Sequence, residues 1–129
     1  MHTHILPETL PNFAEKFGYG DFIYLMHNQD GSANMMQGDK FFRRIQPNCW
    51  DPDIRIKDYE KFDTQVQVVC TIPVMFSYWA KGKDAKALSE FLNDDIAQLS
   101  ENYPQNYLGL GTIPMQDADL AIKEMERCK

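Results

Sequence analysis

Short apolar segments and helical segments alternate along the second half of the chain, and this alternation constrains the fold more than any other feature. The segments 64–73 and 107–114 are apolar and suit buried strands, whereas 51–62, 84–100 and 117–128 have helical spacing. Such alternation predicts parallel strands joined by right-handed crossovers. We therefore expect an α/β protein built on a parallel sheet.

Each predicted helix has a start signal or an apolar face. Asp51 and Pro52 suit the N-cap and first position of the helix over 51–62, and Asp84 suits the cap of the next helix. The expected apolar faces consist of Ile56, Tyr59 and Phe62 in the first helix, Leu88, Phe91, Leu92, Ile96 and Leu99 in the second, and Ala121, Met125 and Cys128 in the third.

The first half of the chain has a different pattern. Residues 1–6 suit the end of a strand, and residues 12–20 contain turn-forming residues without a helical period. Residues 21–46 predict a meander of three antiparallel strands, because the turn signals NQDG and GD separate its apolar runs. We therefore expect a small antiparallel insertion, spanning about residues 12–50, between the first strand and the first long helix.

Charge and cysteine content exclude several classes of partner and compartment. The formal net charge is -6 and there is no long basic run, which argues against nucleic acid or an anionic membrane surface as a partner. No apolar stretch approaches the length of a membrane span. The three cysteines, Cys49, Cys70 and Cys128, form no CxxC motif, so reduced thiols in a cytoplasmic protein are expected, with Cys49 and Cys70 buried.

His2 and His4 are the strongest chemical signal in the sequence. Residues two apart on a strand point to the same face, so the two imidazoles are expected to lie together at the C-terminal end of the first strand. This is half of a metal site, and the spacing alone allows zinc, cobalt, nickel or manganese. An N-terminal pair can equally be a solvated tail. The remaining histidine, His27, falls inside the meander and is expected to be structural.

Several longer strings resemble the amidohydrolase superfamily, and in particular its zinc-dependent decarboxylases. The resemblance runs along nearly the whole chain. Its motifs are HTHILP (2–7), FGYG (17–20), NCWDPDIRI (48–56), TIPVMFSYWAK (71–81), LGLGTIPMQ (108–116) and LAIKEMERC (120–128).

The resemblance implies a metal-dependent (β/α)8 TIM barrel of which this chain is the N-terminal portion, with about three βα units and the insertion after the first strand. It implies one Zn²⁺ per full-length subunit, held by His2 and His4 together with a later histidine and a late aspartate. It also implies a second downstream histidine that activates the bound water, a small carboxylate substrate, and a homodimer. No catalytic residue of this kind is expected among residues 1–129.

Three residues are candidates for substrate binding. Arg43 matches the family's arginine for the substrate carboxylate, and a planar guanidinium can bind a carboxylate through two parallel hydrogen bonds. Phe42 matches an aromatic residue near the substrate, and Met75 follows the second parallel strand, where it could line the barrel mouth. Arg44 should point to the opposite face and be solvated. The family motif has a lysine where this chain has Gln37.

The chain is short for the chemistry that the resemblance implies. A TIM barrel typically needs ~250 residues, so residues 1–129 are expected to form a single incomplete barrel domain that is inactive alone. Two alternatives remain open. One is a related decarboxylase or hydrolase of the superfamily with a different substrate. The other is a non-catalytic truncated chain that pairs with a full-length subunit through an exposed strand edge.

Overall fold

Three parallel strands, each followed in the chain by a helix, form one layer of the molecule. The computed structural model describes all 129 residues. Strands β1 (His2–His4), β5 (Gln67–Cys70) and β6 (Tyr107–Gly109) pair in the order β1-β5-β6, and both pairs are parallel. The helices are α2 (Pro52–Glu60), α3 (Gly82–Asn102) and α4 (Ala118–Arg127). The predicted alternation and the parallel sheet are both confirmed, although the strands are shorter than predicted.

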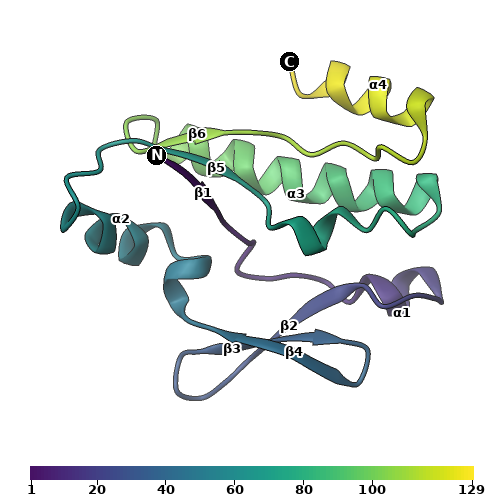
Figure 1. Ribbon diagram of the computed structural model, residues 1–129, viewed down its shortest axis with the longest axis horizontal. Coiled ribbons are helices and arrows are strands. Elements are labelled where there is room, and N and C mark those ends of the chain that lie inside the picture. Colours follow the sequence, from purple (N-terminus) through teal and green to yellow (C-terminus); the bar gives the residue numbers. More distant parts are fainter.

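A second, antiparallel sheet lies between β1 and α2 in the chain. It contains β2 (Ile23–His27), β3 (Ala33–Gln37) and β4 (Lys40–Ile45), paired in sequence order, so the predicted meander is confirmed. Figure 1 shows this sheet and the short helix α1 (Phe13–Phe17) apart from β1, β5 and β6. Helix α1 was not predicted, because five residues between Asn12 and the left-handed Gly18 are too few to show a period.

The N-terminal caps of helices α2 and α3 differ from one another. Helix α2 begins as predicted, because the Asp51 carboxylate accepts hydrogen bonds from the backbone amides of Asp53 and Ile54, both at 2.9 Å. The expected cap of α3 is wrong. Lys81 occupies the N-cap without a side-chain hydrogen bond, and Asp84 lies inside the first turn, where it accepts a 2.7 Å hydrogen bond from the Tyr19 hydroxyl.

Two hydrophobic cores share helix α3. The larger core joins α1 and the antiparallel sheet to the first half of α3 and contains Leu6, Leu10, Phe13, Phe22, Ile23, Ala33, Met35, Ile45, Trp50, Met75, Ala80, Ala85, Leu88 and Leu92. The smaller core lies against the parallel sheet and contains Ile5, Val69, Ile96, Leu99 and Tyr107. Four of the five residues expected on the apolar face of α3 are therefore core residues, and the fifth, Phe91, packs against the larger core.

The expected apolar faces of α2 and α4 are only partly correct. In α2 the buried residue is Arg55, while Phe62 is 75% exposed just beyond the helix. In α4 Ala121 is buried as expected, but its buried neighbour is Glu124 and Met125 is 52% exposed. Both buried charges have polar partners, which periodicity of apolar residues does not reveal.

None of the helices has both the length and the apolar character that crossing a lipid bilayer requires.

Candidate metal centre

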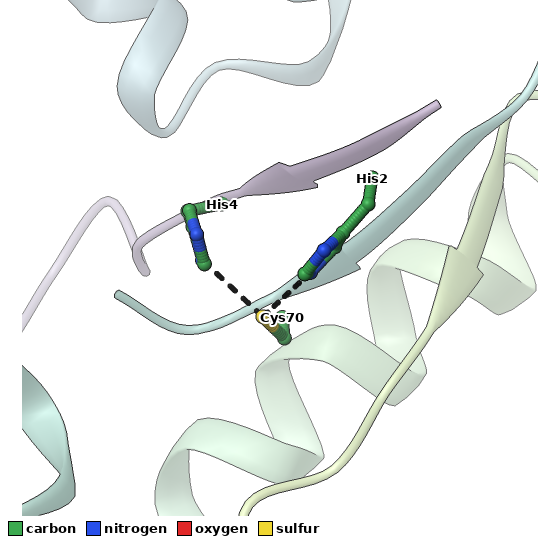
Figure 2. A group of neighbouring side chains, drawn as sticks. All are labelled: His2, His4 and Cys70. Atoms are coloured by element: carbon green, nitrogen blue, oxygen red, sulfur yellow. Dashed lines mark hydrogen bonds between the residues drawn. The ribbon is translucent and has the colours of Figure 1, made fainter. Parts of the chain in front are cut away.

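His2 and His4 lie together on β1, with their side chains on the same face of the strand. Their ring centroids are 5.2 Å apart, and both residues are exposed. Figure 2 shows both imidazoles directed toward one point beside the neighbouring strand. The alternation of side chains along a strand produces this arrangement, since residues two apart share a face.

The point on which the imidazoles converge is the sulfur of Cys70, the last residue of β5. His2 Nε2 lies 3.3 Å and His4 Nδ1 lies 3.2 Å from Cys70 Sγ (Figure 2). One ligand atom from each of the three residues lies within 4.8 Å of the others. Cys70 was expected to be a buried thiol, but it is only partly buried. The register of β1 on β5, which pairs His4 with Cys70, instead places it beside the histidines.

Backbone hydrogen bonds hold β1 against β5 and so fix the three side chains. The amide of Ile5 donates to the carbonyl of Cys70 at 2.9 Å, and the amide of Val68 donates to the carbonyl of Met1 at 2.7 Å. His4 Nδ1 also lies 3.1 Å from the carbonyl oxygen of Thr71, to which it can donate a hydrogen bond. The same nitrogen is the one that lies nearest Cys70 Sγ, so an ion bound at Nδ1 would replace this hydrogen bond.

The donor set suits a borderline divalent ion. Two imidazoles and a thiol are typical ligands of zinc, and adjacent donor atoms in a tetrahedral zinc site lie roughly 3.3–3.6 Å apart. The separations of 3.2 and 3.3 Å around Cys70 Sγ are close to that spacing. Burial raises the pKa of the Cys70 thiol, so the metal-free chain keeps that proton at neutral pH.

A mostly apolar hollow adjoins the cluster. It has a volume of about 450 Å³ and includes His2 and Cys70 in its lining. The other lining residues come from the segments that follow β5 and β6, and they are Phe76, Tyr78, Leu110, Gly111, Thr112, Ile113 and Met115. A small molecule in this hollow would therefore lie beside both the imidazole of His2 and the thiol.

The predicted substrate residues lie away from the cluster, on or near the antiparallel sheet. Arg43 is exposed on β4, and its guanidinium lies 5.9 Å from the centroid of the Phe42 ring. No hydrogen bond or ion pair joins Arg43 to the histidines. It stands opposite the buried Met35, so it projects from the face of the sheet that carries the larger core.

Arg44 points to the other face, as expected, but it has partners there. Its guanidinium pairs with the Asp30 carboxylate and donates a 2.9 Å hydrogen bond to the Ser32 hydroxyl, which ties β4 to the turn before β3. Met75 does not line an open site in this structure. It is 2% exposed and belongs to the larger core, because the turn η2 (Pro73–Phe76) directs it inward.

His27 is structural, as predicted. Its Nε2 donates a 2.7 Å hydrogen bond to the carbonyl of Glu8, and its ring packs edge-on against Trp50 at 5.0 Å between centroids. These contacts link β2 to the loop after β1. His27 therefore contacts other groups than the expected ligands His2 and His4 do.

Comparison with known proteins identifies the relatives of the chain. No family model matches it. It is 49% identical over 128 residues to a 2-amino-3-carboxymuconate-6-semialdehyde decarboxylase from Dictyostelium discoideum, a match that covers 99% of this chain and 36% of that protein. A protein of the same name from Caenorhabditis elegans is 42% identical over 95% of this chain and 31% of its own length. The chain thus spans about a third of the curated relatives.

Solved structures with similar folds include an amidohydrolase and dihydroxybenzoate decarboxylases. A protein from Staphylococcus aureus described as an amidohydrolase is 32% identical with a TM-score of 0.54, over 59% of this chain and 25% of that one. A dihydroxybenzoic acid decarboxylase from Polaromonas, solved with bound manganese, has a TM-score of 0.60 at 24% identity, over 64% of this chain and 25% of its own. The α/β fold therefore matches a part of amidohydrolase TIM-barrel enzymes. Nearly the whole chain is homologous to a segment that makes up about a third of the length of each of the two 2-amino-3-carboxymuconate-6-semialdehyde decarboxylases.

Proposed function

We propose that this chain is part of a zinc-dependent enzyme that decarboxylates 2-amino-3-carboxymuconate 6-semialdehyde to 2-aminomuconate 6-semialdehyde. The reaction is non-oxidative, releases CO2, and belongs to tryptophan catabolism through kynurenine. The observation that carries the proposal is the pair of imidazoles on β1 in a chain similar to such decarboxylases over 99% of its length.

The three βα units form the N-terminal portion of a (β/α)8 barrel in this proposal, with residues 12–50 inserted after β1. The C-terminal ends of barrel strands form the active site in this fold, and His4 and Cys70 are the last residues of β1 and β5. We assign the further ligands, a histidine and an aspartate, and the water-activating histidine to parts of the enzyme outside these 129 residues.

His2 and His4 would hold the ion, which is one Zn²⁺ per full-length subunit. A bound divalent ion supplies Lewis acidity and lowers the pKa of a coordinated water toward neutrality. The manganese of the Polaromonas decarboxylase agrees with a divalent ion in this fold. The structure supports the assignment through donor chemistry, because β1 presents two imidazole nitrogens to one point.

Arg43 would bind a carboxylate of the substrate through a planar, bidentate pair of hydrogen bonds. Its support is that the guanidinium is exposed and lacks an ion-pair partner, whereas neighbouring Arg44 is already paired with Asp30. Phe42, beneath the guanidinium, would pack on the unsaturated chain of the substrate. Met75 contributes to packing rather than to substrate contact, because it is buried in the larger core.

A chimera tests the function. The segment of the Dictyostelium decarboxylase that matches this chain is replaced by residues 1–129, and CO2 release from the carboxymuconate semialdehyde is followed together with zinc content. We expect an active, zinc-containing enzyme, and loss of both zinc and activity in the His2→Ala and His4→Ala variants. Arg43→Lys should raise KM far more than the matched control Arg44→Lys.

Two outcomes of the same experiment would favour other functions. A chimera that binds zinc and decarboxylates a different carboxylate, but not this one, would indicate a related enzyme of the superfamily. CO2 release by the isolated 129-residue chain at the rate of the chimera would refute the proposal that this chain alone is inactive.

A specific observation also favours the second candidate, a non-catalytic chain that pairs with a full-length subunit in the cytoplasm. Strand β6 pairs with β5 on one side only, and Leu108 on it is 57% exposed. An unpaired edge with exposed apolar residues invites another chain. For this candidate, co-expression with a full-length homologue would give a mixed dimer, detected by size exclusion. The full-length subunit expressed without this chain would form the homodimer expected for the complete enzyme.

A further inference from the structure

We infer that Cys70 is a third protein ligand, so that His2, His4 and Cys70 together form a site of two imidazole nitrogens and one thiolate sulfur within this chain. The inference rests on the metal site proposed above and adds to it a donor from a second strand. In this inference the chain binds a borderline or soft divalent ion, such as Zn²⁺ or Co²⁺, without any ligand from outside residues 1–129.

Three side chains from two strands converge on one point. The His2 Nε2 and His4 Nδ1 atoms lie 3.3 and 3.2 Å from the same sulfur, and the sequence separations of these contacts are 68 and 66 residues. Local chain geometry therefore does not produce the cluster. It depends on the parallel register that sets His4 beside Cys70, and that register is fixed by the backbone ladder of β1 on β5.

Cys70 differs from the other two cysteines in its surroundings. The sulfur of Cys49 has only a 3.8 Å contact with the side-chain oxygen of Asn48, and that of Cys128 lies 3.4 Å from the amide nitrogen of Asn93 and 3.5 Å from a Glu124 oxygen. Neither sulfur contacts an imidazole. Cys70 alone combines a thiol with two nitrogen donors, and thiolate with imidazole is a common zinc and cobalt donor set.

The three donor side chains are accessible to an ion from solvent. His2 and His4 are exposed and Cys70 is partly exposed, so an ion can reach all three donors without unfolding. His2 and Cys70 also line the apolar hollow, so an ion at this position would face a space large enough for a small molecule. An open coordination position beside a substrate-sized space distinguishes metal sites that react from closed structural ones.

Cobalt binding to the purified 129-residue chain tests the inference, because a cobalt–thiolate bond produces a charge-transfer absorption in the near ultraviolet that imidazole does not. We expect this band to develop to one Co²⁺ per chain. It should persist in the double variant Cys49→Ser/Cys128→Ser, whose only thiol is Cys70, and disappear in Cys70→Ser. Circular dichroism of each variant before titration separates loss of the ligand from loss of the fold.

A second measurement uses the unaltered chain. Zn²⁺ should slow alkylation of Cys70 by iodoacetamide at least tenfold, as measured by peptide mass spectrometry, while the rates for Cys49 and Cys128 stay within twofold. The inference is overturned if Co²⁺ binds without the thiolate band, if the band survives in Cys70→Ser, or if Zn²⁺ leaves alkylation of Cys70 unchanged.

These results are separable from the proposed function. Cobalt binding that depends on His2 and His4 but shows no thiolate band would keep the histidine site and remove only Cys70 from it. In the chimera, an active enzyme in which Cys70→Ser leaves the cobalt spectrum unchanged would have the same meaning. Absence of any binding that depends on the histidines would contradict both proposals.

Discussion

The two sheets of this chain are stabilised in different ways. The antiparallel sheet and α1 share the larger core with the first half of α3, and aromatic residues such as Phe13, Phe22 and Trp50 fill it. The parallel sheet has a core of only five buried residues, and it relies in addition on polar side chains. The region that carries the candidate metal ligands is therefore the one with less apolar packing.

Buried hydrogen bonds replace part of the missing apolar contact around the parallel sheet. Arg55 of α2 donates to the side chain of Gln67 and to the carbonyl of Asn48, both at 2.8 Å. Glu124 of α4 accepts hydrogen bonds from Asn93 of α3 and from Arg127, both at 2.7 Å. Helices α2 and α4 are therefore attached by hydrogen-bond networks, and the loss of such a network lowers the free energy of unfolding by more than the small number of bonds suggests.

Helix α3 allows a direct test, because it contributes leucines to both cores. We expect Leu92→Ala in the larger core to lower the free energy of unfolding by about 3–5 kcal/mol, and Leu99→Ala in the smaller core by about 2–3 kcal/mol, since fewer neighbours surround the cavity. Urea denaturation of both variants measures the difference. A larger loss of stability in Leu99→Ala than in Leu92→Ala would contradict this difference between the two cores.

Glu124 tests the polar attachment of α4. Burial would raise the pKa of this carboxyl, but hydrogen bonds from Arg127 and Asn93 outweigh burial and lower it below its ordinary value. A lowered folded-state pKa stabilises the chain fully above the unfolded pKa, and this contribution disappears as pH falls through the folded pKa. We therefore expect stability to decrease on acidification below the ordinary glutamate range of about 4.3.

We expect Glu124→Gln to lower the free energy of unfolding by about 2 kcal/mol at neutral pH. The substitution keeps the shape of the side chain but removes the negative charge of the carboxylate that accepts hydrogen bonds from Arg127 and Asn93. Its stability should also change less with acid. Thermal melts from neutral to acidic pH measure both effects. Glu126→Gln, an exposed residue of the same helix, is the control, and an equal effect of the two substitutions would contradict the role given to Glu124.

Gly109 tests how closely β6 approaches α3. A Cβ at this position would lie 2.6 Å from Cγ2 of Ile96 and 3.0 Å from Oγ of Ser100, so Ile96 would have to move. We expect Gly109→Ala to cost about 1–2 kcal/mol through overpacking. Gly111→Ala is the matched control, because its nearest contact would be an ordinary 3.4 Å from Asn93. Equal urea midpoints for the two variants would show that the smaller core is loosely packed.

The smallest effect is expected at the arginines of β4. Arg44→Ala breaks an exposed ion pair with Asp30, so the urea midpoint should fall slightly at low salt and hardly at all at high salt. Arg43→Ala should leave the midpoint unchanged at both salt concentrations, because its guanidinium has only the Phe42 ring beside it. A clear loss of stability in Arg43→Ala would indicate that this residue supports the antiparallel sheet.

The order of the elements was predictable, whereas the polar contacts between them were not. Alternating apolar segments predicted β5, α3, β6 and α4, and the turn signals predicted the meander, because both depend on local periodicity. Arg55 and Glu124 are buried through partners distant in sequence, such as Gln67 and Asn93, and no local pattern marks such pairs.

The candidate metal centre was predictable only within one strand. His2 and His4 belong together because residues two apart share a face, which the sequence shows directly. Cys70 was missed because its place depends on the register of β1 on β5. A parallel register is set by the surrounding packing, and alignment of the strand ends at His4 and Cys70 would have been the one signal available from the sequence.

The separation of β1 from β5 in the chain also determines when the histidine and cysteine side chains can meet during folding. The turn between β2 and β3 is short, and its ends, Asn28 and Ser32, are only four positions apart in the sequence; hairpins of this kind form in about 1–10 μs. Cys70 and His4 are 66 residues apart, and pairings across such a loop form slowly because the loop loses more conformational entropy. We therefore expect the three donors to come together after the antiparallel sheet has formed, and an ion that binds them would then stabilise a late step of folding.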